Sequence, residues 1–83
     1  MKSYNTADNL EDLNITEELF SFDGVCGVSE NYQILEDEYK DADYYIWINE
    51  DAKVSEIEEL LLPLGMKAYI EHEDGTITKI ENE

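Results

Sequence analysis

The chain has 83 residues, a length that suits one small domain, and we expect a single acidic globular domain over 1–83. It carries 22 Asp and Glu residues against five Lys, no Arg and one His, so its formal net charge is −17. Surfaces that bind nucleic acids or anionic membranes are rich in Lys and Arg. The charge therefore argues against direct binding to either and favours a basic partner.

The beginning of the chain predicts a frayed segment followed by short helices. Residues 1–6 are polar and are expected to fray. Over 7–22 the apolar residues follow a helical spacing, as Ile15 and Leu19 do, and Asn14 is a candidate N-cap. We expect one or two short helices here.

Neither a signal peptide nor a transmembrane helix is predicted. The first residues lack an apolar region, and no run of about 18 apolar residues occurs in the sequence. The single cysteine, Cys26, has no internal disulfide partner, which fits a reducing compartment, and we expect it to be a small buried side chain. A cytoplasmic location follows as an expectation.

The next segment has two ambiguous parts. Residues 23–29 (DGVCGVS) favour a short strand or a tight loop, and their glycine spacing matches no phosphate-binding motif. Residues 30–42 fit either a helix capped by Ser29 or a strand followed by an acidic loop. We favour a strand at 32–35, because a hairpin onto the following strand would cover the edge of that strand.

The stretch 36–51 (EDEYKDADYYIWINED) combines seven carboxylates with four aromatic rings. Its second half, 43–49, is the clearest strand, with Tyr44, Ile46 and Ile48 on one face and Tyr45, Trp47 and Asn49 on the other. Both faces are apolar enough for a central strand. We expect Trp47 to pack with Phe20 or Phe22, and Tyr39 to be exposed together with one of Tyr44 and Tyr45.

A helix is predicted over about 55–62. Ser55 and Glu58 have the spacing of a capping box. Pro63 disturbs the last turn, and Gly65 is a natural left-handed exit. The expected buried stripe consists of Ile57, Leu60, Leu61 and Leu64.

The C-terminal part predicts a hairpin around Glu73-Asp74-Gly75. A two-residue turn would scatter the isoleucines over both faces. A three-residue loop pairs Ile70 with Thr78 and Ala68 with Ile80, which gathers Ala68, Ile70 and Ile80 on one face and places Tyr69, Glu71, Ile77 and Lys79 on the other. We therefore choose the longer loop. The strand–helix–strand run of about 43–72 should close as a right-handed crossover with parallel strands. The predicted fold is α+β: a small three- or four-stranded mixed sheet with this crossover, a C-terminal β-hairpin and short N-terminal helices.

The residues do not predict a metal site. Asp37, Asp41 and Asp43 raise the possibility of a calcium loop, but no register of an EF-hand fits. Counting from Asp41, for example, places Tyr45 at the fifth position and Ala52 at the twelfth.

The residues do not predict an enzyme either. A chain this short leaves little room for a substrate cleft between paired carboxylates. His72 suits a capping role near the hairpin loop better than general-base catalysis, and Cys26 has no Lys or His close to it in sequence. Stacking of bases on the tyrosines would require a basic groove, which is missing. We predict no cofactor and no catalytic residue.

The size of the charge calls for an explanation. A small domain stays soluble with a net charge of about 2–8. Duplex DNA carries about one charge per 1.7 Å, so seventeen charges correspond to roughly 29 Å of duplex, about the diameter of a small domain. Simple solvation of an acidic surface is the alternative explanation. The carboxylates are spread along the chain rather than gathered in a tail, which favours a surface of fixed positions.

In size, charge and α/β pattern the chain resembles the small acidic inhibitors of phages and other mobile elements, the DNA mimics of the anti-CRISPR or anti-restriction type. It also resembles acidic immunity proteins that plug nuclease toxins. No motif defines these classes, so the resemblance assigns no residue. It implies a partner that is a basic nucleic-acid-binding protein or nuclease, and the host cytosol as location if a phage encodes the protein.

The acidic stretch itself supplies the candidate contacts, in which carboxylates stand in for phosphates. The predicted partner-binding residues are Glu36, Asp37, Glu38, Tyr39, Asp41, Asp43, Glu50 and Asp51. The alternative is a small protein-interaction or regulatory domain that binds through exposed tyrosines.

Overall fold

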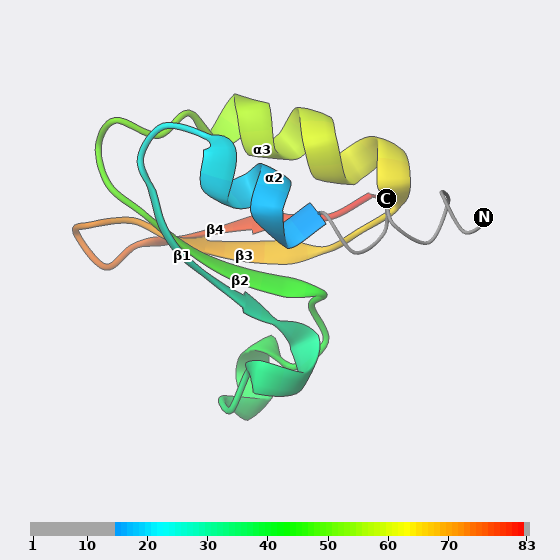
Figure 1. Cartoon of the computed structure of the whole chain (residues 1–83). Coiled ribbons are helices and arrows are strands. Elements are labelled where there is room, and N and C mark those ends of the chain that lie inside the picture. The colour runs from blue at the N-terminus through cyan, green and yellow to red at the C-terminus, as the bar shows by residue number, and fades with distance from the viewer. Residues whose placement is uncertain (1–14, 83) are drawn as a thin grey trace, which may run out of the picture.

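The computed structural model describes residues 15–82, which form a four-stranded sheet with two helices on one of its faces (Figure 1). The strands lie in the order β1 (Val25–Glu30), β2 (Tyr44–Ile48), β3 (Ala68–Glu71) and β4 (Ile77–Ile80). The β1–β2 and β3–β4 pairs are antiparallel, and β2–β3 is parallel. This mixed sheet confirms the predicted α+β fold.

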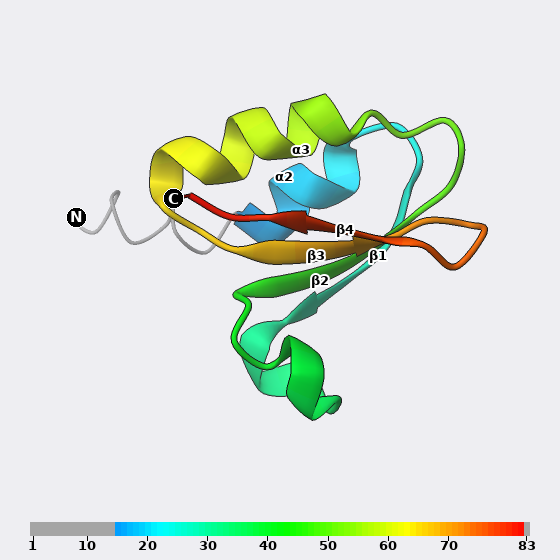
Figure 2. The same ribbon diagram turned by 180° about the vertical axis from the view of Figure 1, so that it is seen from behind.

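Helix α2 (Ile15–Ser21) and helix α3 (Val54–Leu61) cover the same face of the sheet. Figure 2 shows this arrangement from behind, with both helices above the sheet and the segment between β1 and β2 below it. We call the face without α-helices the open face. Residues 1–14, including the predicted N-cap Asn14 and the predicted frayed start, lie outside the described residues.

The covered face is built from aliphatic residues. β2 contributes Ile46 and Ile48, and β3 contributes Ile70, because alternate residues of a strand point to the same face. The fully buried side chains of this core are Leu19, Ile46, Ile57, Leu61, Ile70 and Ile80. Since they come from both helices and three strands, this one layer holds the described fold together.

The edge of β2 is covered by β1, which lies earlier in the chain than we predicted. The predicted strand at 32–35 is wrong: residues Asn31–Gln33 form a 3₁₀ turn, and a second one follows at Asp37–Tyr39. The strand interpretation of 23–29 is correct instead. Val25 and Val28 pack against the core, and these β-branched residues suit an edge strand with one buried face.

A β-bulge in β1 explains why the predicted burial of Cys26 is wrong. Val25 faces Ile48 and Gly27 faces Trp47, so Cys26 has no partner position on β2. The extra residue is turned out to solvent, and Cys26 is exposed.

Helix α3 begins one residue before the predicted start. Its N-cap is Lys53, which makes no side-chain cap hydrogen bond, so the predicted capping box of Ser55 is wrong. A 3₁₀ turn at Leu62–Leu64 follows the helix and ends at Gly65, whose φ of 72° is left-handed as predicted. Leu64 is 52% exposed, because this turn leads it away from the buried stripe.

The C-terminal hairpin has the predicted register. Ala68 pairs with Ile80 and Ile70 pairs with Thr78, which gathers the apolar residues on the covered face. The loop closes through hydrogen bonds from the His72 N–H to the Thr76 carbonyl and from the Gly75 N–H to the His72 carbonyl. The His72 side chain also contacts Thr78 across the hairpin, with Nε2 and Oγ1 2.7 Å apart.

Candidate functional site

The open face is ordered in two rows that run across the strands. In the first row Ser29, Tyr45, Tyr69 and Lys79 are successive partners from β1 to β4. In the second row the partners are Gly27, Trp47, Glu71 and Ile77. Cross-strand neighbours of this kind are in side-chain contact range, so the register itself assembles a mixed aromatic and charged surface.

Tyr39 lies on top of the first row. Its ring centroid is 5.0 Å from that of Tyr45 and 4.9 Å from that of Tyr69, and both ring pairs are tilted. Tyr45 in turn lies 4.9 Å from Trp47. Aromatic pairs at these distances and angles are favourable. Four rings therefore form one continuous row over the open face.

The stacking changes which tyrosines are exposed. Tyr44 and Tyr45 are both buried, at 8% and 7% exposure, so the prediction that one of them is exposed is wrong. Tyr44 belongs to the core below the helices, whereas Tyr39 covers Tyr45 from the other side. Trp47 does not pack with Phe20 or Phe22 as predicted, because it points to the open face and keeps 38% of its surface exposed.

Carboxylates surround this aromatic row. The Tyr45 hydroxyl donates a hydrogen bond of 2.8 Å to Oε1 of Glu71. Burial, followed by this hydrogen bond, raises the pKa of Tyr45 far above its ordinary value of 10.0. Burial and the nearby carboxylates of Glu38 and Glu36 also raise the pKa of Tyr39. Both phenols thus remain neutral in a negative environment.

The segment from residue 36 to 43, which we call the acidic rim, is held in a defined shape. The side-chain amide of Asn31 donates to the carbonyls of Lys40 and Ala42. Ala42 within the rim is 1% exposed, and Ile34 just before it is 4% exposed, so buried side chains anchor the segment near both of its ends. The carboxylates of the rim are therefore presented on an ordered turn.

Two of the predicted contact residues in the rim join it to β3 instead. Asp41 forms an ion pair with Lys67 and accepts a hydrogen bond from the Tyr69 hydroxyl at 3.2 Å. Asp43 accepts a hydrogen bond of 2.9 Å from the Lys67 backbone N–H. The Lys67 side chain, then the Tyr69 hydroxyl, lower the pKa of Asp41. These two carboxylates are occupied with holding the rim against the sheet.

Three carboxylates of the rim remain available at its exposed tip. Glu36, Asp37 and Glu38 are all exposed, and the one ion pair among them in the described chain is Asp37 with Lys40 at 3.8 Å. The Asp37 side chain is 96% exposed, so water and salt screen this pair strongly.

The structure does not bring Glu50 and Asp51 to the acidic rim. They follow β2, whereas the rim precedes it, so the five-residue strand separates the two groups by roughly 17 Å. Glu50 instead lies next to the hairpin loop, where its backbone N–H donates to Oε1 of Glu73 at 2.9 Å. The eight predicted contact residues therefore occupy two ends of the molecule.

Sequence reasoning missed the residues that complete the open face beside the rim. They are Gly27, Leu35, Tyr69, Glu71 and Ile77. A signal was present for three of them, because the predicted hairpin register already placed Tyr69, Glu71 and Ile77 together on the face opposite the core. A parallel pairing with 43–49 joins that face to Tyr45 and Trp47.

Few of the described carboxylates form an ion pair with a lysine. In the described part of the chain, lysine ion pairs involve the carboxylates of Asp37, Asp41 and Glu81. None of the described Asp and Glu residues is buried.

Within residues 15–82 no group of three or more His, Cys, Asp or Glu side chains is arranged to hold a metal ion. The described helices include none that is long and apolar enough to cross a membrane.

The chain matches no protein-family model, no curated protein and no solved structure.

Proposed function

We propose that this protein is an acidic inhibitor that mimics nucleic-acid phosphates. It occupies the basic DNA- or RNA-binding channel of a nuclease or another nucleic-acid enzyme, such as a CRISPR effector or a restriction enzyme. The observation that carries the proposal is the surface position of the described carboxylates, few of which have a lysine partner.

The physical reason for this proposal is that the net negative charge destabilises the folded protein. Unpaired like charges on one small domain repel each other and destabilise the folded state, whereas a basic channel relieves that repulsion. Each carboxylate that meets Arg or Lys forms a charge-assisted hydrogen bond of the type that phosphate oxygens form. We assign the leading contacts to Glu36, Asp37 and Glu38, because they stand at the ordered tip of the rim.

The second candidate is a protein-interaction domain that binds through its aromatic residues. The observation that favours it is the open face, where Trp47 and Ile77 are 38% and 37% exposed. Exposed aromatic residues at the centre of a patch are common in protein interfaces. This candidate predicts a complex that high salt leaves nearly intact.

Capture followed by competition tests the leading proposal. The immobilised protein is exposed to a bacterial lysate at low salt, bound proteins are eluted with a salt gradient, and each is purified. We expect a nucleic-acid enzyme whose affinity for this protein falls steeply between 50 and 500 mM salt and whose bound duplex DNA the protein displaces. A partner that binds equally well at both salt concentrations, or that holds the protein and DNA at once, would contradict mimicry.

A further inference from the structure

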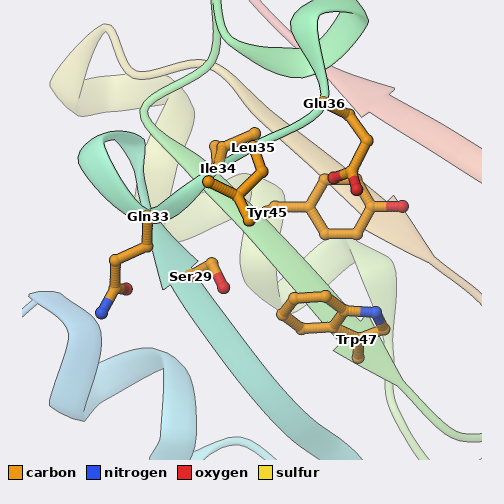
Figure 3. Close-up of a pocket in the computed structure, with 7 residues that line it drawn as sticks. All are labelled: Ser29, Gln33, Ile34, Leu35, Glu36, Tyr45 and Trp47. Atoms are coloured by element: carbon orange, nitrogen blue, oxygen red, sulfur yellow. The ribbon is translucent and has the colours of Figure 1, made fainter.

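The open face carries a groove beside Trp47. Two adjoining hollows of about 210 and 460 Å³ share Glu36, Tyr45 and Trp47, and we call them together the aromatic groove. Leu35, Glu71 and Ile77 also line it. Figure 3 shows the half below Leu35, with Tyr45 and Trp47 on β2 as its floor and Glu36 above them.

Gly27 helps to shape this floor. A Cβ atom at this position would approach Cε3 of Trp47 to 3.1 Å, so the indole lies close over the strand where a side chain is missing. Trp47 is thereby laid against β1 and Tyr45 while one part of the ring stays open to solvent. A flat aromatic surface results, bounded by carboxylates.

The two ends of the aromatic row differ in charge balance. At the Tyr69 end, Lys79 Nζ lies 5.8 Å from the ring centroid, and Lys67 and Lys79 bind Glu81 at 3.1 and 3.5 Å. At the Trp47 end, Glu36 and Glu71 line the groove, and neither has a lysine ion pair within the described chain. The fold thus already places a cation over one end of the row.

We propose that the aromatic groove receives an arginine side chain of the basic partner, with the guanidinium stacked on Trp47 and bonded to the carboxylates of Glu36 and Glu71. This inference rests on the proposed function and specifies how the partner is recognised. Charge complementarity selects a cation, and the indole surface selects a planar one. Arginine fits better than lysine because its guanidinium stacks on aromatic rings, is weakly hydrated and donates to a carboxylate through two N–H groups.

A nucleobase would fit the aromatic floor but not the rim of the groove. Single-stranded nucleic acids bind to stacking platforms that are lined with positive charge. Here the phosphates of such a strand would meet Glu36, Glu71 and the neighbouring Glu38. The surrounding charge therefore favours a protein cation over a base.

Trp47 allows a direct test, because it is the one tryptophan of the chain. Capped tri-arginine, capped tri-lysine and an oligothymidylate are each titrated into the full-length protein while Trp47 emission is recorded. We expect a saturable emission change with tri-arginine, binding at least about threefold weaker with tri-lysine, and no change with the oligonucleotide. Unchanged emission at saturating tri-arginine, equal binding of the two peptides, or a response to oligothymidylate would overturn the inference.

Matched charge variants separate the groove from general acidity. E36Q/E71Q removes two charges from the groove, and E56Q/E59Q removes two from the exposed surface of α3. We expect about tenfold weaker tri-arginine binding for the first variant and less than about twofold for the second. Circular dichroism confirms that both are folded.

An equal loss of tri-arginine affinity in the two variants would show that the peptide binds through net charge alone, and would overturn the proposal that the groove binds arginine. The proposed function is decided separately, by the salt dependence and DNA displacement of the unmodified protein. The peptide titrations can therefore contradict the arginine site while the displacement measurements still support phosphate mimicry, and the reverse is also possible.

Discussion

The two faces of the sheet differ in chemistry although the same strands build both. The covered face consists mainly of aliphatic side chains, together with Tyr44, that are excluded from water by α2 and α3. The open face consists of aromatic rings and charged groups, with Trp47 and Ile77 partly exposed. The comparison indicates that stability resides mainly in the covered face, which leaves the open face available for recognition.

Neighbouring residues of β2 give the sharpest test of this division, because Ile46 points to the covered face and Trp47 to the open face. Ile46 is fully buried, so Ile46→Ala should lower the free energy of unfolding by about 2–5 kcal/mol. The whole protein is expected to have about 4–12 kcal/mol of stability, so this change is large. Trp47→Ala should cost about 1 kcal/mol, because the indole is partly exposed.

Urea unfolding followed by far-ultraviolet circular dichroism measures both effects. If Trp47→Ala destabilised the protein as much as Ile46→Ala does, the open face would be a second structural core, and the division between the two faces would be wrong.

A smaller effect is expected at Tyr39, which stacks on Tyr45 and Tyr69. Tyr39→Ala removes both ring contacts and uncovers Tyr45, so it should lower the urea midpoint, though by less than Ile46→Ala. Tyr32→Ala is the matched control, because Tyr32 is 76% exposed, and its midpoint should stay close to that of the wild type. Equal midpoints for the two variants would mean that the rim is not anchored through Tyr39.

The smallest expected effect is a pH dependence at the junction of rim and sheet. Lys67 holds the pKa of Asp41 below its ordinary value of 3.8. A carboxyl whose pKa is lower in the folded state stabilises the fold above its unfolded pKa, and this contribution is lost as the pH falls through the folded value. Asp41→Asn should therefore be less stable than the wild type at pH 5, and the difference should shrink as the pH falls below 3.8.

Thermal unfolding from pH 5 to pH 2 records this difference. Asp37→Asn is the control for the loss of one charge, since that side chain is 96% exposed. A stability difference between Asp41→Asn and the wild type that stayed constant over the whole pH range would contradict the role given to the Lys67 ion pair.

The sequence was most informative where one face of an element is buried. The alternation in 43–49 identified β2, and the gathering of Ala68, Ile70 and Ile80 on one face selected the hairpin register that the structure has. Helix α3 followed from its apolar spacing, although its cap did not, because Lys53 rather than Ser55 precedes the first helical turn. Periodicity predicts buried faces well because burial is what it reflects.

The sequence was least informative between β1 and β2. Residues 31–43 contain two 3₁₀ turns whose order depends on single contacts, such as the Asn31 side chain with the Lys40 and Ala42 carbonyls. Such contacts join positions far apart in sequence and leave no periodic signal. The same applies to the bulge at Cys26 and to the stacking of Tyr39, which buries Tyr45 on the face that neither α-helix covers.

The candidate site was predictable in kind but not in arrangement. The acidic stretch identified Glu36, Asp37 and Glu38 at the exposed tip, whereas chain proximity alone joined Glu50 and Asp51 to them. Strand β2 separates these groups, and the parallel pairing with β3 brings Glu71 beside Trp47 instead. To predict that residues from distant segments share one face of the sheet, the strand topology must be known as well as the sequence.

We propose that carboxylates of the rim replace phosphates in a basic channel, and one competition measurement tests this most directly. The concentration that displaces duplex DNA from the captured enzyme is determined for wild type, E36Q/D37N/E38Q and the control E18Q/E56Q/E59Q, whose changes lie on α2 and α3. We predict that the rim variant needs at least about tenfold more protein, whereas the helix variant behaves like wild type. Equal displacement by all three proteins, or an equal loss in both variants, would contradict the claim.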